Sequence, residues 1–539
     1  MDATPRVLLI GIDGGTFRVI RPGISSGKLP AFQQIIETGI SGVLRSTIPP
    51  ATIPAFPTLM TGKNCGKHGI FDFMGKKDSK TILMDSTQIT GKTLWRILSD
   101  FGKKCIVVNV PLTFPPENID GIIISGMLTP IGRDFAHPKQ LMEELDNLTG
   151  GYPVQFDSSI ADTNPSQFLP KLHELLTKRH TAIRYLMQKG EWDLFVALFR
   201  ATDIVAHHRW ADQKGVLSIY EHVDRILGEL LLEYPNTHLF IFSDHGFAPY
   251  KKDFHINLYL NQLGLLTIQQ KHRKEKRLQE TTKIKPIQAE RFASVLARMG
   301  IYRSRLRNII PPPLWNKLRK LAGPSFRRYI SPSHLEVDEK RSKAYFSPTF
   351  TAETQSITIN ASTSEEYEEL VNKLKKAFSD LKDPESGNSV VNAVFHRRDI
   401  YTGPFVDNAP DLILLLSEDY KATKTLSGKN ILERLSQIKG THERSGVFMA
   451  KGGWIKAGHS ISEIDLQDIT PTILHLFDLP IPDDVDGEVK EEIFLADSDP
   501  AKRKPKFYTS KDEKRRQVQL SKQEEEEIKD RLRSLGYID

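Results

Sequence analysis

Short runs of consecutive apolar residues recur along the first half of the chain, and helical patterns separate them. The runs lie at 7–12, 104–110, 120–126, 193–199 and 238–244, and the helical patterns lie at 29–39, 167–189 and 219–234. A strand that is buried on both faces is apolar at consecutive positions, as in parallel sheets covered by helices. The sequence therefore predicts an α/β fold in which a mainly parallel sheet lies between two layers of helices.

This alternation breaks between about 266 and 340. The chain there is polar and basic, and it holds two helical patterns, one of which begins after three prolines. Strand patterns return at 344–350, 411–416 and 446–452, with helical patterns at 365–381 and 465–480. The predicted domains are a core in two parts at 1–265 and 341–490, an inserted basic helical cap at 266–340, and a charged C-terminal tail helix at 491–539.

The positive charge of the chain is concentrated in this insertion. The 539 residues carry a net charge of +7, but 271–330 alone holds 17 Lys and Arg against 3 Asp and Glu. The segment is either a solvated cap or a basic lid. A lid would steer polyanionic substrates or lie on an anionic membrane surface through Phe292, Leu296, Met299 and Trp315. No pattern of stacking aromatics predicts a specific nucleic-acid module.

The remaining composition is typical of a soluble globular protein, with 39% hydrophobic and 26% charged residues. No apolar run is long enough to span a bilayer, and the first residues do not have the pattern of a signal peptide. The two cysteines, Cys65 and Cys105, agree with a reducing compartment. We therefore expect a cytoplasmic location, peripheral to a membrane if the basic segment binds lipid.

Acidic and histidine residues stand at the ends of four predicted strands. Asp13 follows the first strand, Asp203 follows the strand at 193–199, Asp244 and His245 end the strand at 238–244, and His442 precedes the strand at 446–452. Ligands of α/β proteins bind beyond the carboxyl ends of the parallel strands. Taken singly, Asp13 is better explained as a turn or helix-capping residue, but the convergence of four strand ends favours a shared site.

The chemistry of these residues suits divalent metals. Asp and His together bind Zn²⁺, and also Mn²⁺ or Fe²⁺. The spacing of Asp203 and His207 places both on one face of a helical turn, and the neighbours Asp244 and His245 are able to reach different metals. His208 beside His207 remains an alternative ligand, and the chain offers further histidines at His68, His222 and His255.

A threonine hydroxyl is a candidate nucleophile, because a bound dication lowers its pKa. Thr52 lies in a proline-rich segment that opens a helical stretch, where the helix dipole favours an anionic substrate. Spacing alone explains Thr52 equally well as a helix N-cap. It also leaves Thr47, Thr58 and Thr61 as alternatives.

The ordered set of motifs resembles the alkaline phosphatase superfamily, and within it the type I phosphodiesterase/nucleotide pyrophosphatase family. The resemblance spans roughly 1–265 and 340–490. It is carried by GIDGG at 11–15, TIPAFPTLMTGKNCGKHGI at 52–70, TDIVAHHRW at 202–210, SDHGF at 243–247 and GTHERSGVFMAKG at 441–453.

The resemblance implies an alkaline phosphatase-like core and two divalent metal ions, usually Zn²⁺, with Mn²⁺ as the alternative. One metal is then held by Asp203, His207 and His442, and the other by Asp13, Asp244 and His245 together with Thr52. Thr52 is the implied nucleophile and forms a phosphoryl-threonine intermediate that water hydrolyses. The implied substrate is a phosphorylated small molecule or a lipid-linked phosphoester.

One position departs from the family pattern. Nucleotide pyrophosphatases carry Asn three residues after the nucleophilic Thr, and here that residue is Ala55. That Asn helps to bind a phosphoryl oxygen of the substrate. In this chain, a backbone N–H or one of the nearby cations would bind this oxygen instead, and the candidates are Lys63, Lys67, Arg200 and Arg209. We expect phosphodiester or pyrophosphate hydrolysis ahead of phosphatase activity. The alternatives are a phosphomutase-type phosphotransferase, or a non-catalytic metal-binding member whose basic insertion binds a membrane or a partner.

Overall fold

The computed structural model describes residues 5–77, 80–270, 335–347, 349–426, 428, 430–510 and 520–535. The basic segment 271–330, with Phe292, Leu296, Met299 and Trp315, lies outside the described residues, so the helical cap and its membrane contact stay predictions. Within the described ranges, no helix is both long and apolar enough to cross a membrane.

A nine-stranded sheet forms the core, in the order β20-β2-β19-β9-β1-β8-β5-β6-β7. Its strands are β1 (Val7–Ile12), β2 (Ile40–Arg45), β5 (Cys105–Val108), β6 (Gly121–Ile124), β7 (Ala136–His137), β8 (Leu194–Phe199), β9 (His238–Phe242), β19 (Ser445–Lys451) and β20 (His459–Asp465). The five central strands β9, β1, β8, β5 and β6 are parallel. β19 runs antiparallel between β9 and β2. The predicted mainly parallel sheet is confirmed.

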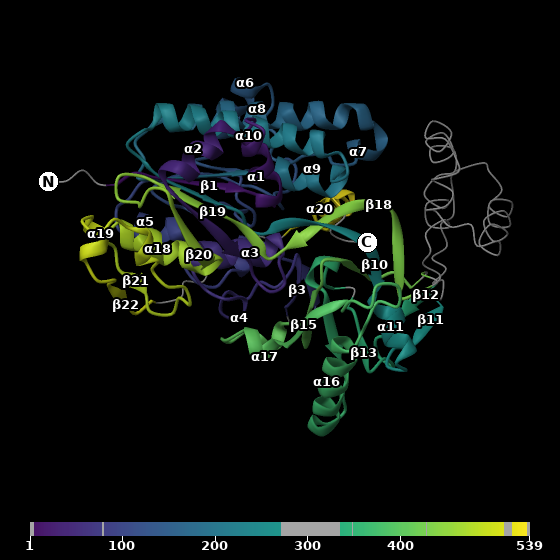
Figure 1. The fold of residues 1–539 in the computed structure, drawn as a ribbon. Helices are drawn as coiled ribbons and strands as arrows, with labels where there is room; N and C mark the ends of the chain where they lie inside the picture. Colours follow the sequence, from purple (N-terminus) through teal and green to yellow (C-terminus); the bar gives the residue numbers. More distant parts are fainter. Residues whose placement is uncertain are drawn as a thin grey trace.

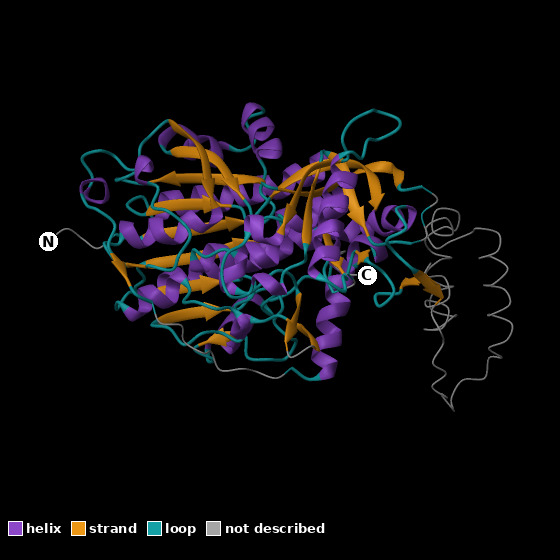
Figure 2. Cartoon of the chain, turned by 90° about the horizontal axis from the view of Figure 1, so that it is seen from below, coloured by secondary structure: helices purple, strands orange, loops and turns teal. Residues whose placement is uncertain are grey.

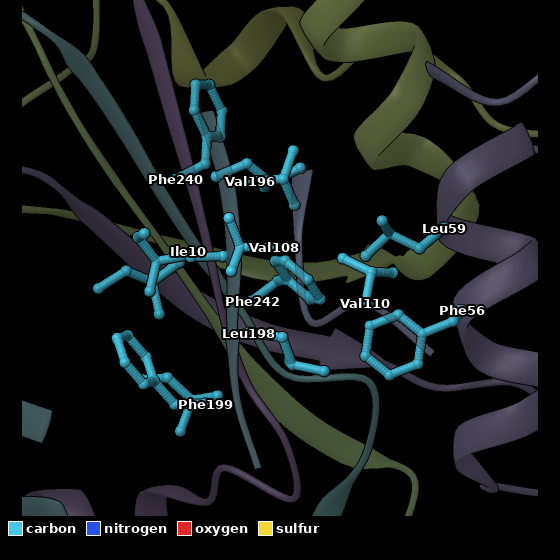
Figure 3. Close-up of a cluster of buried hydrophobic side chains, with 14 of the residues drawn as sticks. Ile10, Phe56, Leu59, Val108, Val110, Val196, Leu198, Phe199, Phe240 and Phe242 are labelled. Carbon is cyan, nitrogen blue, oxygen red and sulfur yellow. The ribbon is translucent and has the colours of Figure 1, made fainter. Parts of the chain in front are cut away.

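Helices cover both faces of this sheet (Figure 1). One layer contains α1 (Phe17–Ser25), α2 (Pro30–Thr38), α8 (Pro165–Lys189), α9 (Ala201–Arg209) and α10 (Gln213–Glu233), and the other contains α3 (Thr52–Thr61), α5 (Leu94–Asp100) and α18 (Ile469–Leu476). Continuous burial along β1 and β8 explains their uninterrupted apolar sequence. Phe56 of α3 packs edge to face on Phe242 of β9, with ring centroids 6.2 Å apart (Figure 3).

A second, smaller sheet stands beside the core (Figure 2). It consists of β13 (Ala344–Tyr345), β14 (Ser356–Ile359), β16 (Leu412–Leu416) and β15 (Val391–His396), paired antiparallel in that order. Helix α16 (Ser364–Ser379) buries Leu370, Leu374 and Phe378 in the separate hydrophobic cluster of this sheet. The apolar strand expected at 411–416 therefore pairs here, and the chain re-enters the nine-stranded sheet at β19.

A long two-stranded ribbon joins the two sheets. β10 (Gly246–His255) leaves the core directly after β9, and β18 (Leu432–Glu443) returns antiparallel to it, with β17 (Asp419–Thr423) on the other side of β10. Because β18 runs straight into β19, its last residues lie at the same edge of the core sheet as the first residues of β10. This ribbon therefore brings Phe247 opposite His442.

The charged tail contains the expected helix, α20 (Lys522–Leu535). Two apolar residues one turn apart, Ile528 and Leu532, are each 1% exposed and belong to the main core cluster. Arg133 pairs with Glu524, and Arg531 donates to the carbonyl oxygen of Thr129. The helix is therefore docked on the core through its narrow apolar stripe.

Candidate metal centre

The carboxyl edge of the central sheet gathers the acidic and histidine residues expected there. Asp13 follows β1, and Asp244 and His245 follow β9. Asp203 lies in the first turn of α9, which begins directly after β8. All four of these side chains are fully buried. The parallel strands bring Asp13 and Asp244, which are 231 positions apart in the chain, into one site.

Three of the site residues converge on one another. The Nε2 atoms of His207 and His442 lie 2.9 Å apart. They are 3.2 Å and 3.5 Å, respectively, from Oδ1 of Asp203. Asp203 and His207 meet because they are four residues apart on α9. One carboxylate oxygen and two imidazole nitrogens form a ligand set of the kind that Zn²⁺ prefers.

A second group shares Asp203 with the first. Nε2 of His245 lies 3.3 Å from Oδ2 of Asp244, 3.7 Å from Oδ1 of Asp13 and 3.2 Å from the Thr52 hydroxyl oxygen. Asp13, Asp203 and His245 are close enough together to hold one ion. The structure thus brings together all seven residues that the sequence analysis singled out.

Backbone carbonyls orient two of the imidazole rings. Nδ1 of His245 donates to the carbonyl oxygen of Gly246 at 3.0 Å, and Nδ1 of His442 donates to that of Pro50 at 3.1 Å. Because Nδ1 carries the proton in each neutral ring, Nε2 keeps a lone pair that faces the carboxylates. Such outer hydrogen bonds are typical of histidines that bind metals.

Two buried carboxylate oxygens of the candidate metal centre accept no hydrogen bond from the described residues. Among the described residues, Oδ1 of Asp13 and Oδ2 of Asp244 have no hydrogen-bond partner. Burial and the neighbouring Asp203 carboxylate raise the pKa of Asp13 to about 7. Burial and the Asp13 carboxylate raise the pKa of Asp244 well above its ordinary value. Ionised carboxylates this deeply buried are stabilised by a bound cation, so the residues present fit divalent metals.

One arginine and one glycine support this arrangement. Nε of Arg200 donates to Oδ2 of Asp13 at 2.7 Å, and its Nη2 lies 3.7 Å from Oδ2 of Asp203. Gly14 has a φ of +64°, and its N–H donates to Oδ1 of Asp244 at 3.2 Å. A Cβ at Gly14 would lie 3.0 Å from the Phe247 ring. Gly14 of GIDGG thus positions the candidate metal ligand Asp244 through backbone geometry.

Thr52 is the first residue of α3 and not its N-cap, a position that Ala51 occupies without a side-chain hydrogen bond. The three rival threonines are turned away from the centre. Thr47 donates to the carbonyl oxygen of Pro49, and Thr58 and Thr61 donate to those of Pro54 and Pro57. Of the candidate hydroxyls, Thr52 therefore faces the ligand cluster.

The other candidate residues have partners of their own. His208 packs edge to face on Phe168, His222 pairs with His173, and His255 interacts with the carbonyl oxygen of Thr425. Of the cations considered as substitutes for the missing Asn, Lys63 pairs with Asp484, Lys67 pairs with Asp486, Arg209 donates to the carbonyl oxygen of Pro165, and Arg200 is bound to Asp13.

His68 is a structural residue with a predictable pH effect. Its Nδ1 accepts from the N–H of Ile70 and its Nε2 bonds the Thr58 hydroxyl, so the buried ring is neutral. Burial lowers the pKa of His68 to about 3. Since the folded state binds fewer protons than the unfolded state below pH 6.5, stability falls on acidification. The free energy of unfolding falls as the pH is lowered from 6.5 to 3, and the total decrease is on the order of 3–5 kcal/mol.

The variant His68→Asn keeps an acceptor for Ile70 but does not titrate. We expect it to be less stable than the wild type at pH 7, by about 1–3 kcal/mol, and to lose less stability between pH 6.5 and pH 4. Urea unfolding midpoints measured across this range check the difference. Parallel pH profiles for the two proteins would contradict it.

The short helix η2 (Ala352–Thr354), which precedes β14, contributes a carboxylate that sequence patterns did not identify. Glu353 is 2% exposed and pairs with Lys421 at 2.6 Å. Burial lowers the pKa of His442, whereas Glu353 and then Asp203 raise it, and the pKa of His442 ends above its ordinary value. Glu353 lies in a stretch with no motif, and only the ribbon of β10 and β18 brings this part of the chain near the centre.

Comparison with known proteins identifies the family of the chain. The model of the family described as type I phosphodiesterase/nucleotide pyrophosphatase matches residues 7–446. Among curated proteins, no sequence matches the chain.

Solved structures of two enzymes share the fold at 13% sequence identity. One is an inactive form of murine ectonucleotide pyrophosphatase/phosphodiesterase 5 in complex with AMP. It matches with a TM-score of 0.50 over 91% of this chain and 100% of its own. The other is phosphonoacetate hydrolase from Sinorhizobium meliloti 1021 in complex with phosphonoacetate. It matches with a TM-score of 0.53 over 88% of this chain and 95% of its own.

Proposed function

Because the chain belongs to the type I phosphodiesterase/nucleotide pyrophosphatase family, we propose that it acts through a phosphoryl-threonine intermediate at a two-metal site. Family membership makes it a phosphoester hydrolase of the alkaline phosphatase superfamily. The observation that carries the proposal is the convergence of three buried carboxylates and three imidazoles beside the Thr52 hydroxyl.

The ligand sets follow the two clusters. Asp203, His207 and His442 would hold one divalent ion, and Asp13, Asp244, His245 and Thr52 the other. Zn²⁺ is the preferred ion for this mixture of carboxylates and imidazoles, with Mn²⁺ as the alternative. When bound, the two ions lower the pKa of the nucleophile and neutralise charge on the attacking and leaving oxygens.

The residues of the chain supply the nucleophile and its orientation. The Thr52 oxygen attacks phosphorus in line, its proton passes to solvent, and the bond to the leaving oxygen breaks. Water then attacks the phosphoryl-threonine and restores the Thr52 hydroxyl. Arg200 holds the Asp13 carboxylate in place during both steps, and the carbonyls of Gly246 and Pro50 hold the His245 and His442 rings.

The start of α3 offers a replacement for the donor that Ala55 removes. Ala51 makes no side-chain cap, so the first N–H groups of the helix, those of Thr52 and Ile53, are not occupied by capping. These groups and the dipole of the ten-residue helix favour a phosphoryl oxygen at this position. Lys63, Lys67 and Arg209 are bound elsewhere, which favours the backbone donors.

The proposed substrate class is a phosphorylated small molecule, with diesters or pyrophosphates ahead of monoesters. The two related structures with AMP and phosphonoacetate support a small phosphorus-containing ligand. To test this, the purified chain is assayed with bis(p-nitrophenyl) phosphate and p-nitrophenyl phosphate in Zn²⁺ and in Mn²⁺. We expect turnover of both esters, with kcat/KM for the diester at least about tenfold higher, and about two metal ions per chain.

The same assay separates the alternatives. A phosphotransferase would release p-nitrophenol but pass the phosphoryl group to an added alcohol in preference to water, which the yield of inorganic phosphate reveals. No product from either ester by the metal-loaded protein would favour the non-catalytic member. A faster monoester reaction would overturn the substrate order and leave the nucleophile intact.

A further inference from the structure

A cavity opens at the same edge of the central sheet as the candidate metal centre, beyond the ends of β2 and β20. Its volume is about 290 Å³, and its lining includes Ser46, Thr58, Tyr401, Arg444 and Asp465. Tyr401 directly follows α17 (Arg397–Ile400), so the cavity lies where the second sheet meets the core. No residue of the proposed metal centre lines it.

Two polar groups of this cavity have unused hydrogen-bonding capacity. The Ser46 hydroxyl belongs to a residue that is 3% exposed, and it has no hydrogen-bond partner within the described ranges. Arg444 donates from Nε to the carbonyl oxygen of Ser46 at 3.1 Å. In the part of the chain that the structure describes, its terminal nitrogens make no hydrogen bond and no ion pair.

The neighbouring polar groups are already satisfied. Arg45 pairs with Asp465 at 2.6 Å and with Glu463 at 2.7 Å. The Thr58 hydroxyl donates to the carbonyl oxygen of Pro54, and the Tyr401 hydroxyl donates to that of Ile48. The charged residues that line the cavity are Arg45, Arg444 and Asp465, so two positive charges face one negative charge there.

We propose that this cavity binds the carboxylate or phosphate of a small molecule through the Arg444 guanidinium and the Ser46 hydroxyl. Arg–oxoanion hydrogen bonds are charge-assisted and often bidentate, and a buried hydroxyl without a partner is costly unless a ligand satisfies it. The volume lies at the lower end of small-molecule pockets, about 300–1,000 Å³. It therefore suits a group with few carbon atoms.

The cavity lies close to the nucleophile along α3. Thr58 follows Thr52 by six residues of the same helix, which corresponds to about 9 Å along its axis. Arg444 is two residues from His442. The oxoanion therefore has one of two sources. It is either the far end of the substrate whose phosphorus lies at Thr52, which rests on the proposed function, or part of a separate small molecule.

Binding of inorganic sulfate, an oxoanion that is not hydrolysed, tests the site without any turnover. Calorimetric titration is run on the metal-loaded full chain and on Arg444→Met and Ser46→Ala. We expect sulfate affinity to fall about tenfold or more in Arg444→Met and about threefold or more in Ser46→Ala. The matched control is Thr351→Val. It removes a hydroxyl that is equally buried and unpartnered among the described residues but does not line the cavity.

Unchanged sulfate affinity in both cavity variants, at unchanged metal content, would overturn the site. Ser46→Ala keeps the test decisive if Arg444→Met does not fold, because removal of an unpartnered hydroxyl should not destabilise the protein. Steady-state kinetics then identify the source of the oxoanion. A raised KM at constant kcat indicates the far end of the substrate, whereas lost sulfate binding with constant KM indicates a separate molecule.

Discussion

Replacement of Thr52 with alanine is expected to lower kcat for phosphodiester hydrolysis at least about 10³-fold, because the chain then lacks the oxygen that attacks phosphorus. The Thr52 hydroxyl lies 3.2 Å from Nε2 of His245, and no rival threonine hydroxyl is turned towards the centre. Steady-state assays of the purified variant with bis(p-nitrophenyl) phosphate measure the loss. Mass spectrometry of the acid-quenched wild-type reaction should locate the phosphoryl group on the peptide that contains Thr52.

The matched control is Thr61→Ala in the same helix. Thr61 is fully buried, and its hydroxyl donates to the carbonyl oxygen of Pro57. Its loss removes one hydrogen bond without removing a group of the metal centre, so kcat should stay within about a factor of three. Wild-type turnover in Thr52→Ala, or equal losses in both variants, would refute the nucleophile.

Substitution of Asp203 with asparagine is expected to remove bound metal and to lower kcat/KM by at least about 10²-fold. Asp203 is the carboxylate that both ligand clusters share. The substitution also removes one of three buried negative charges, and with it much of the electrostatic attraction for a dication. Metal content is measured by mass spectrometry of the purified variant, and the thermal midpoint is measured with and without added Zn²⁺.

Asp224→Asn provides a buried carboxylate outside the centre. Asp224 is 3% exposed and accepts from the N–H groups of Ala31 and Phe32 at the start of α2. This variant should lose stability through the weakened helix cap but keep its metal and its response to Zn²⁺. Full metal occupancy in Asp203→Asn would contradict the proposed ligand sets, even if its turnover were low.

The order and type of the core elements follow from local sequence. A strand buried on both faces must be apolar at consecutive positions, so β1, β8 and β9 are visible as short apolar runs, and the helices between them are visible as periodic patterns. The parallel arrangement follows from this alternation. The same logic places Asp13, Asp203 and Asp244 at one edge, because the carboxyl ends of parallel strands share it.

Membership of a sheet is a tertiary property. The run at 412–416 is as continuously apolar as β1, yet it pairs with β14 and β15 in the second sheet. An apolar run reports burial on both faces but not the identity of its neighbours. For the same reason, sequence patterns do not relate Glu353, in the short helix before β14, to His442.

The residue types of the site and the sheet edge that holds them can be predicted from the sequence, since both depend on local burial and on strand direction. The directions of individual polar atoms depend instead on contacts that form on folding. The threonine hydroxyls at 47, 52, 58 and 61 differ only in what lies opposite each of them, and Thr52 alone among them faces the ligand cluster. The unused donors of Ser46 and Arg444 emerge in the same way, because hydrogen-bond satisfaction is a property of neighbours brought together by folding.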